Sequence, residues 1–116
     1  MKLAYSTYAL QNVDPFEAIA GVREIGYDAI ELNTHEAWPT APGKLDADTR
    51  KQLRDTLQSA GFPSPVLMNL VGPCELDENT DDKLHVLEET CRLGDYLNYD
   101  GRPKVVTTTL GNRPGS

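Results

Sequence analysis

The fold of this 116-residue chain is decided by one stretch, Gly26-Tyr27-Asp28-Ala29-Ile30-Glu31-Leu32. Its glycine can adopt the left-handed backbone that ends a helix, and the apolar residues after it are typical of a short strand. A similar junction, Gly61-Phe62, precedes a second strand-like run at 65–70. A helix that ends on glycine and leads at once into a strand indicates a parallel β/α unit.

The same alternation extends over the whole chain. Asp14 and Asp46 can cap two helices, and apolar residues recur at helical spacing after each of them. The inner helix faces are predicted to include Ile25 in the first helix and Leu84 in the third. Strands are predicted over 3–7, 27–32, 65–70 and 105–110, and helices over 14–26, 46–61 and 80–97.

Four strands and three helices predict the N-terminal half of a (β/α)8 barrel. A complete barrel of this kind needs about 250 residues, more than twice the length of this chain. A small, complete open sheet is the alternative. Against it, Ser6-Thr7-Tyr8-Ala9-Leu10 follows the first strand where a doubly wound dinucleotide-binding domain has a glycine-rich phosphate loop.

Composition narrows the classes of partner. The chain has 18 acidic and 11 basic residues, and its net charge of -7 argues against a broad nucleic-acid surface. No apolar run approaches the roughly 18 residues of a membrane span, and the N-terminus lacks the features of a signal peptide. We therefore expect a cytoplasmic protein without membrane contacts. Cys74 and Cys91 fit no metal or redox spacing, so both are expected to be reduced and structural.

Three segments together resemble the xylose-isomerase-like TIM barrels. They are 2–8, Gly26-Tyr27-Asp28-Ala29-Ile30-Glu31-Leu32 and 105–111. This superfamily includes sugar and sugar-phosphate isomerases and epimerases, inosose dehydratases and type-four apurinic endonucleases. The resemblance covers essentially the whole chain, but only the first half of the family's barrel.

The resemblance implies a metal-dependent isomerase or epimerase acting on a sugar or polyol. Its reaction would move a proton through an enediolate, with a divalent metal (Mn, Mg, Zn or Co) at the barrel mouth. In the isomerase branch the metal ligands come from later strands, so no metal ligand is assigned in this chain. We therefore expect the chain alone to bind no metal and to be inactive.

Candidate site residues follow the strands, because active sites in these barrels lie at the carboxyl ends of the strands. His35 is the candidate catalytic residue, since an imidazole can transfer a proton near neutral pH. The candidate substrate-binding residues are Tyr8, Glu31, Asn33, Trp38, Asn69 and Thr109. Trp38 can stack on a sugar ring, and the amide of Asn69 can both donate to and accept from hydroxyls.

Each assignment has a structural alternative. His35 can be a solvated loop residue, and Trp38 can pack the long loop 33–45 onto the protein. Glu31 can pair with a cation, and Asn69 can cap local backbone.

Two other functions remain open. An apurinic endonuclease would need several histidines on the early strands and a basic rim, whereas here His35 is the one histidine near a predicted strand end. A non-catalytic half-barrel would instead associate with a partner half or with a second copy through its open sheet edges.

Overall fold

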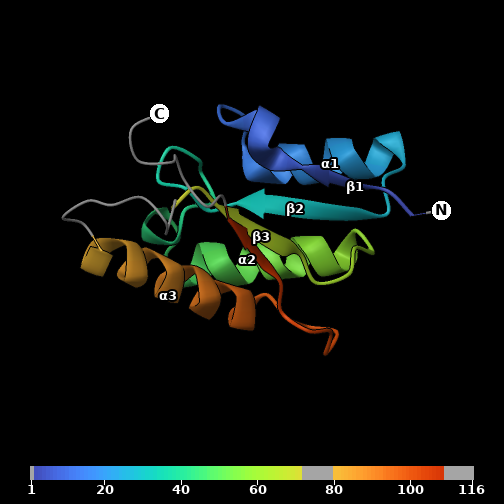
Figure 1. Cartoon of the computed structure of the whole chain (residues 1–116). Coiled ribbons are helices and arrows are strands. Elements are labelled where there is room, and N and C mark those ends of the chain that lie inside the picture. The colour runs from blue at the N-terminus through green and yellow to red at the C-terminus, as the bar shows by residue number, and fades with distance from the viewer. Residues whose placement is uncertain (1, 72–79, 109–116) are drawn as a thin grey trace.

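Four parallel strands form one sheet in the order β1-β2-β3-β4 (Figure 1). The computed structural model describes residues 2–71 and 80–108. The strands are β1 (Ala4–Ser6), β2 (Ala29–Asn33), β3 (Val66–Asn69) and β4 (Val106–Thr108). The α-helices are α1 (Pro15–Ile25), α2 (Ala47–Ser59) and α3 (Thr80–Tyr96), and two 3-10 helices are η1 (Thr7–Leu10) and η2 (Pro42–Lys44).

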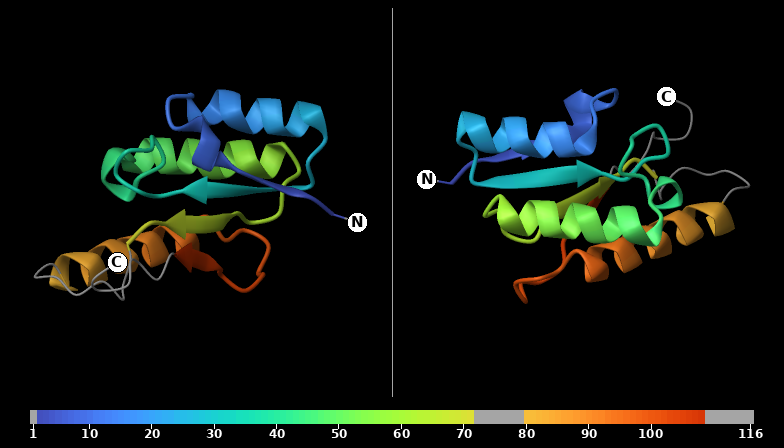
Figure 2. Two further views of the ribbon diagram at one scale, coloured as in Figure 1. Left: turned by 45° about the horizontal axis from the view of Figure 1, so that its top comes forward. Right: turned by 180° about the vertical axis from the view of Figure 1, so that it is seen from behind.

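All three α-helices lie on one face of the sheet, as Figure 2 shows from behind. Each strand pairs in parallel with the next strand along the chain. Because such crossovers are nearly always right-handed, successive steps in one direction put every helix on the same side. The predicted alternation of four parallel strands and three helices is therefore confirmed, whereas closure into a barrel remains a prediction.

Two equivalent turns carry the chain from helix to strand. Gly26 and Gly61 have φ angles of 107° and 81°, in the left-handed region. The next amide then reaches back to a carbonyl five residues earlier: Tyr27 N–H donates to Val22 at 3.3 Å, and Phe62 N–H to Leu57 at 3.2 Å. This is the hydrogen-bonding pattern of a Schellman motif. The two similar junctions seen in the sequence therefore end their helices in the same way.

One hydrophobic core joins the helices to the sheet. Side chains alternate along the strands, so Ile30, Leu32 and Leu67 face the helices and are almost fully buried. Two predicted core positions are wrong: Ile25 is 76 % and Leu84 is 60 % exposed. Ile25 is the last residue of α1, beyond the buried face of that helix.

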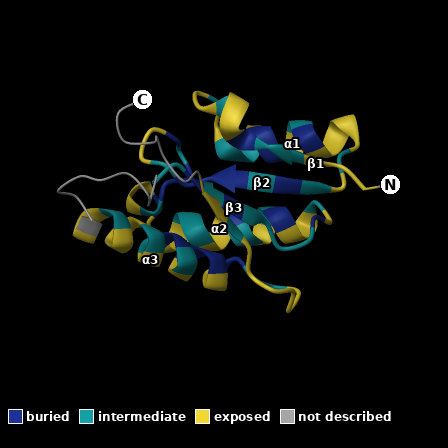
Figure 3. Cartoon of the chain, viewed as in Figure 1, coloured by how far each residue is buried: buried dark blue, intermediate teal, exposed yellow. Residues whose placement is uncertain are grey.

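Leu84 is exposed because the first half of α3 extends past the carboxyl ends of the strands (Figure 3). The second half of this helix packs on the sheet through Leu93 and Leu97, both fully buried. Among the described residues, no helix has both the length and the apolar character that a membrane span requires.

The other side of the sheet is covered by none of the three α-helices, and we call it the open face. Alternation and strand register assign to it Ser6, Glu31, Val66, Met68 and Thr107. Each of these residues is half-buried or exposed, whereas Asn33, which pairs with Met68 and shares this face, is fully buried. A parallel sheet is normally buried on both faces, so the open face is the feature of the fold that most requires an explanation.

A polar clasp ties the segment before β3 to the segment after α3. Tyr99 Oη donates to the carbonyl oxygens of Phe62 and Pro63. Ser64 Oγ accepts the amide hydrogen of Tyr99 at 3.0 Å and donates to an oxygen of Asp100 at 2.7 Å. Burial, reinforced by the negative charge of Asp100, raises the pKa of Tyr99 to about 12. The clasp therefore favours the neutral phenol.

Two glycine substitutions test the helix stop. Neither Gly26 nor Gly21 has a neighbouring atom within 4 Å of an added methyl group, so the two sites differ in backbone conformation and not in space. Gly26→Ala should lower the free energy of unfolding by about 1–2 kcal/mol, the cost of left-handed backbone for alanine. Gly21→Ala, inside α1, should raise it by about 0.5–1 kcal/mol. Urea unfolding measures both, and changes of the same sign would contradict this account.

Alkaline titration tests the clasp. The folded pKa of Tyr99 lies above its unfolded value, so the stability that the hydroxyl contributes is complete below about pH 10 and is lost as pH rises through about 12. Absorbance of the five tyrosines should therefore include a late step near pH 12 that Tyr99→Phe removes. An unchanged late step in that variant would show that another tyrosine is responsible.

Candidate functional site

A carboxylate lies at the centre of the open face. Ser6 Oγ on β1 donates to Glu31 Oε1 on β2 at 2.6 Å, and Thr107 Oγ1 on β4 lies 3.5 Å from Oε2. Glu31 thus spans from β1 to β4 and is half-buried. A carboxylate in this position needs polar partners, and among the described residues hydroxyl groups provide them.

An aromatic group lies at the carboxyl end of β1. The ring of Trp38 is 5.5 Å from the rings of both Tyr8 and His35. Trp38 is only 7 % exposed, and its Nε1 donates to the carbonyl oxygen of Thr7 at 3.1 Å. Trp38 therefore packs the long loop onto η1, whereas Tyr8, at 52 % exposure, presents an accessible ring.

Side-chain hydrogen bonds fix the conformation of the loop between β2 and α2. Thr40 Oγ1 donates to the carbonyl oxygen of Asn33. Arg50, on the first turn of α2, donates from Nε to Leu45 at 3.0 Å and from Nη2 to Pro42 at 2.9 Å. The loop thus holds His35 and Trp38 in one defined arrangement.

His35 is oriented by two local hydrogen bonds. Its amide hydrogen goes to Asn33 Oδ1 at 2.9 Å, and its Nδ1 accepts the amide hydrogen of Ala37 at 3.1 Å. Because Nδ1 is an acceptor, the neutral ring carries its proton on Nε2. His35 therefore offers one N–H donor to a neighbouring ligand.

Asn33 is fully buried, and its side-chain amide has a polar atom without a partner among the described residues. Its amide hydrogen goes to Thr7 Oγ1 at 2.9 Å, and its Oδ1 accepts from His35. Its Nδ2 has no hydrogen-bond partner among the described residues. A buried donor without a partner costs about 1–3 kcal/mol, which the surrounding packing must offset.

Asn69 lies on the helix side of the sheet, away from Glu31. Its Nδ2 donates to Thr34 Oγ1 at 3.0 Å and reaches Thr90 Oγ1, on α3, at 3.5 Å. Thr34 Oγ1 also donates to the carbonyl oxygen of Met68 at 3.0 Å. Thr34 and Thr90, which sequence analysis missed, thus lock the end of β3 to α3. The sequence signal that could have revealed Thr90 is its position three residues before Leu93, on the buried face of the helix.

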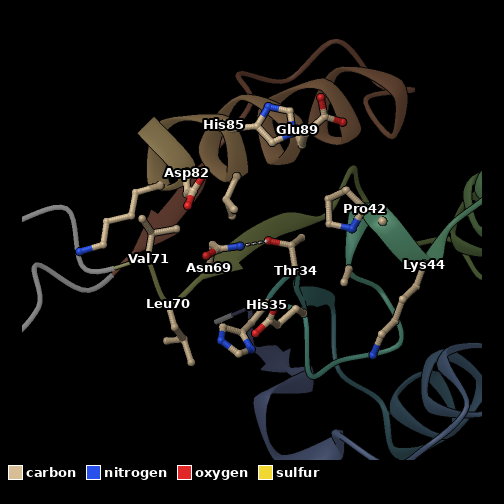
Figure 4. Close-up of a pocket in the computed structure, with 15 residues that line it drawn as sticks. Thr34, His35, Pro42, Lys44, Asn69, Leu70, Val71, Asp82, His85 and Glu89 are labelled. Atoms are coloured by element: carbon tan, nitrogen blue, oxygen red, sulfur yellow. Dashed lines mark hydrogen bonds between the residues drawn. The ribbon is translucent and has the colours of Figure 1, made fainter. Parts of the chain in front are cut away.

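A pocket of about 500 Å³ opens beside this network, between η2, the end of β3 and the first half of α3 (Figure 4). Both histidines of the chain, His35 and His85, line it, as do Asn69 and Thr34. The predicted site residues are therefore divided. Glu31 faces the open side, Asn69 and His35 adjoin the pocket, and Tyr8 and Trp38 lie at the end of β1; Thr109 falls outside the described residues.

Within the described ranges, no group of three or more His, Cys, Asp or Glu residues is arranged to hold a metal ion. No protein-family model matches the chain, and no similar curated protein or solved structure was found.

Two substitutions rank the contacts of the Asn69 network. Asn69→Ala removes both contacts of the amide and should lower the free energy of unfolding by about 1–3 kcal/mol. Thr90→Val keeps the Asn69–Thr34 bond and should cost about 1 kcal/mol. Urea unfolding measures both, with Ser59→Ala on the exposed surface of α2 as a control that changes little. If Thr90→Val lowered the free energy of unfolding more than Asn69→Ala does, the network would depend mainly on Thr90 rather than on the amide of Asn69.

Proposed function

We propose that the chain is the N-terminal half of a metal-dependent sugar or polyol isomerase or epimerase, and that its open face binds substrate hydroxyl groups. The observation that supports this most strongly is Glu31, a carboxylate on the uncovered side of a parallel sheet with all helices on the other side. The sequence resemblance supplies the reaction class.

The chemistry around Glu31 suits a polyhydroxylated ligand. A carboxylate accepts strong hydrogen bonds from hydroxyl groups, and a neighbouring serine or threonine can both donate and accept. Ser6 fixes Oε1 at 2.6 Å, whereas the 3.5 Å contact of Thr107 leaves Oε2 the more available oxygen. In this proposal a substrate hydroxyl donates to Oε2 and exchanges hydrogen bonds with Thr107.

Tyr8 and His35 complete the proposed contribution of this half. The exposed ring of Tyr8 offers an apolar face for the C–H side of a sugar. His35 acts through Nε2, because its Nδ1 is occupied by the backbone. A donor in that position can hydrogen-bond to a substrate oxygen or pass on a proton.

The described residues do not fit the divalent metal that the reaction class implies, since no suitable ligand group is found among them. We therefore assign no step through the metal to this chain. In the proposal, proton transfer between carbons depends on carboxylates outside this half. The residues described here bind and orient the substrate.

Polyol binding tests this function. Titration of the chain with D-xylose and with xylitol, followed by amide chemical shifts, should perturb residues around Glu31 and Thr107. Glu31→Ala should weaken binding by about tenfold or more, because a hydrogen bond to a charged group contributes about 1.5–3 kcal/mol. Glu24→Ala, an exposed carboxylate of α1, is the matched control and should leave binding unchanged.

Two results would contradict the proposal. One is equal binding by wild type and Glu31→Ala. The other is isomerisation of D-xylose by the chain alone with added Mn²⁺, Mg²⁺, Zn²⁺ or Co²⁺, which would mean that the catalytic groups are already present in this half.

A further inference from the structure

The pocket beside α3 shares His35 with the proposed polyol site but none of that site's other residues. Strand alternation puts Glu31 on the open face and Asn69 on the helix side. The hydrogen bond from Asn69 to Thr34 joins β3 to the β2–α2 loop. Any ligand of this pocket would therefore contact α3 and η2 rather than Ser6 or Thr107.

The walls of the pocket are largely apolar. Pro42 and Ala41 line it from the β2–α2 loop, Leu70 and Val71 from the segment after β3, and Val86 from α3. Its volume, about 500 Å³, lies within the range of small-molecule sites in proteins. The pocket can thus enclose the body of a small organic molecule.

The charges around these walls favour a cationic head group. Three carboxylates (Glu36, Asp82 and Glu89) and two lysines (Lys44 and Lys83) line the pocket. Glu89 already pairs with Arg92 at 3.1 Å, and Lys83 is also engaged in an interaction of its own.

Two carboxylates and one ammonium group therefore remain for a ligand. Within the described part of the chain, neither Glu36 nor Asp82 has an ion-pair partner. Lys44 lies at the opposite end of the pocket from Asp82 (Figure 4), so its charge does not compensate Asp82. The net charge of -7 also attracts cations to this surface.

We propose that this pocket binds a small organic amine, with its ammonium group toward Asp82 and its apolar body against Leu70, Val71 and Val86. The Nε2–H of His35 contributes a hydrogen-bond donor at the pocket wall.

The chain carries its own reporter for this binding. Trp38 is the single tryptophan, and its ring is 5.5 Å from that of His35, which lines the pocket. A ligand that contacts His35 should change the fluorescence of Trp38. Amide chemical shifts of His85 and Val86 then locate the ligand independently.

Benzylamine, benzyl alcohol and benzoate have similar shapes but different head groups. Comparing their affinities therefore measures the contribution of the head group to binding. We expect benzylamine to bind most tightly and benzoate least. Asp82→Asn should weaken benzylamine binding by about three- to tenfold, as for a partly exposed charge pair. Because Asp82 is exposed on the first turn of α3, this variant should fold normally.

Asp55→Asn is the matched control, since it makes the same change of charge on the exposed surface of α2 and lies outside the pocket. It should leave benzylamine binding unchanged, as should Glu31→Ala on the open face. Equal binding of benzylamine and benzyl alcohol would overturn the proposal. So would equal losses in Asp82→Asn and Asp55→Asn, which would indicate a general charge effect, or the absence of chemical-shift changes at His85 and Val86.

Discussion

The handedness of the connections is the constraint on which the rest of this structure depends. Each of the first three strands is followed by a helix that returns over the same face, so the core between these helices and the sheet is built on that side. Glu31 and Thr107 are left on the other side, where none of the three described α-helices covers them. The chemistry of the molecule follows from this division, because it decides which polar side chains meet each other and which meet solvent.

Local signals in the sequence were sufficient to predict the alternation of parallel strands and helices. Capping aspartates, glycine stops and short apolar runs act within a few residues, and Asp14, Asp46, Gly26 and Gly61 all have the predicted role. Positions that depend on distant neighbours were less predictable. Leu84 has the spacing of a core residue but lies on a helical turn that extends beyond the sheet.

The candidate site was predictable in its members but not in its arrangement. Glu31 and Asn69 both lie near strand ends, and sequence position alone suggests one common mouth. In the structure they face opposite sides of the sheet, because each follows the alternation of its own strand. Trp38 and Thr90 depend on contacts 31 and 56 residues away, with Thr7 and Thr34. No local pattern could reveal these contacts.

The neighbour-to-neighbour pairing of the strands also has a consequence for how the chain folds. Paired residues are separated by only one β/α unit, from 25 residues for Ala4 and Ala29 to 39 for Leu67 and Val106. β1 and β4 do not pair with each other in this sheet. Loop closure therefore costs least between β1 and β2, and the sheet can grow from this pair by adding one unit at a time, which keeps the entropy of loop closure low at every step.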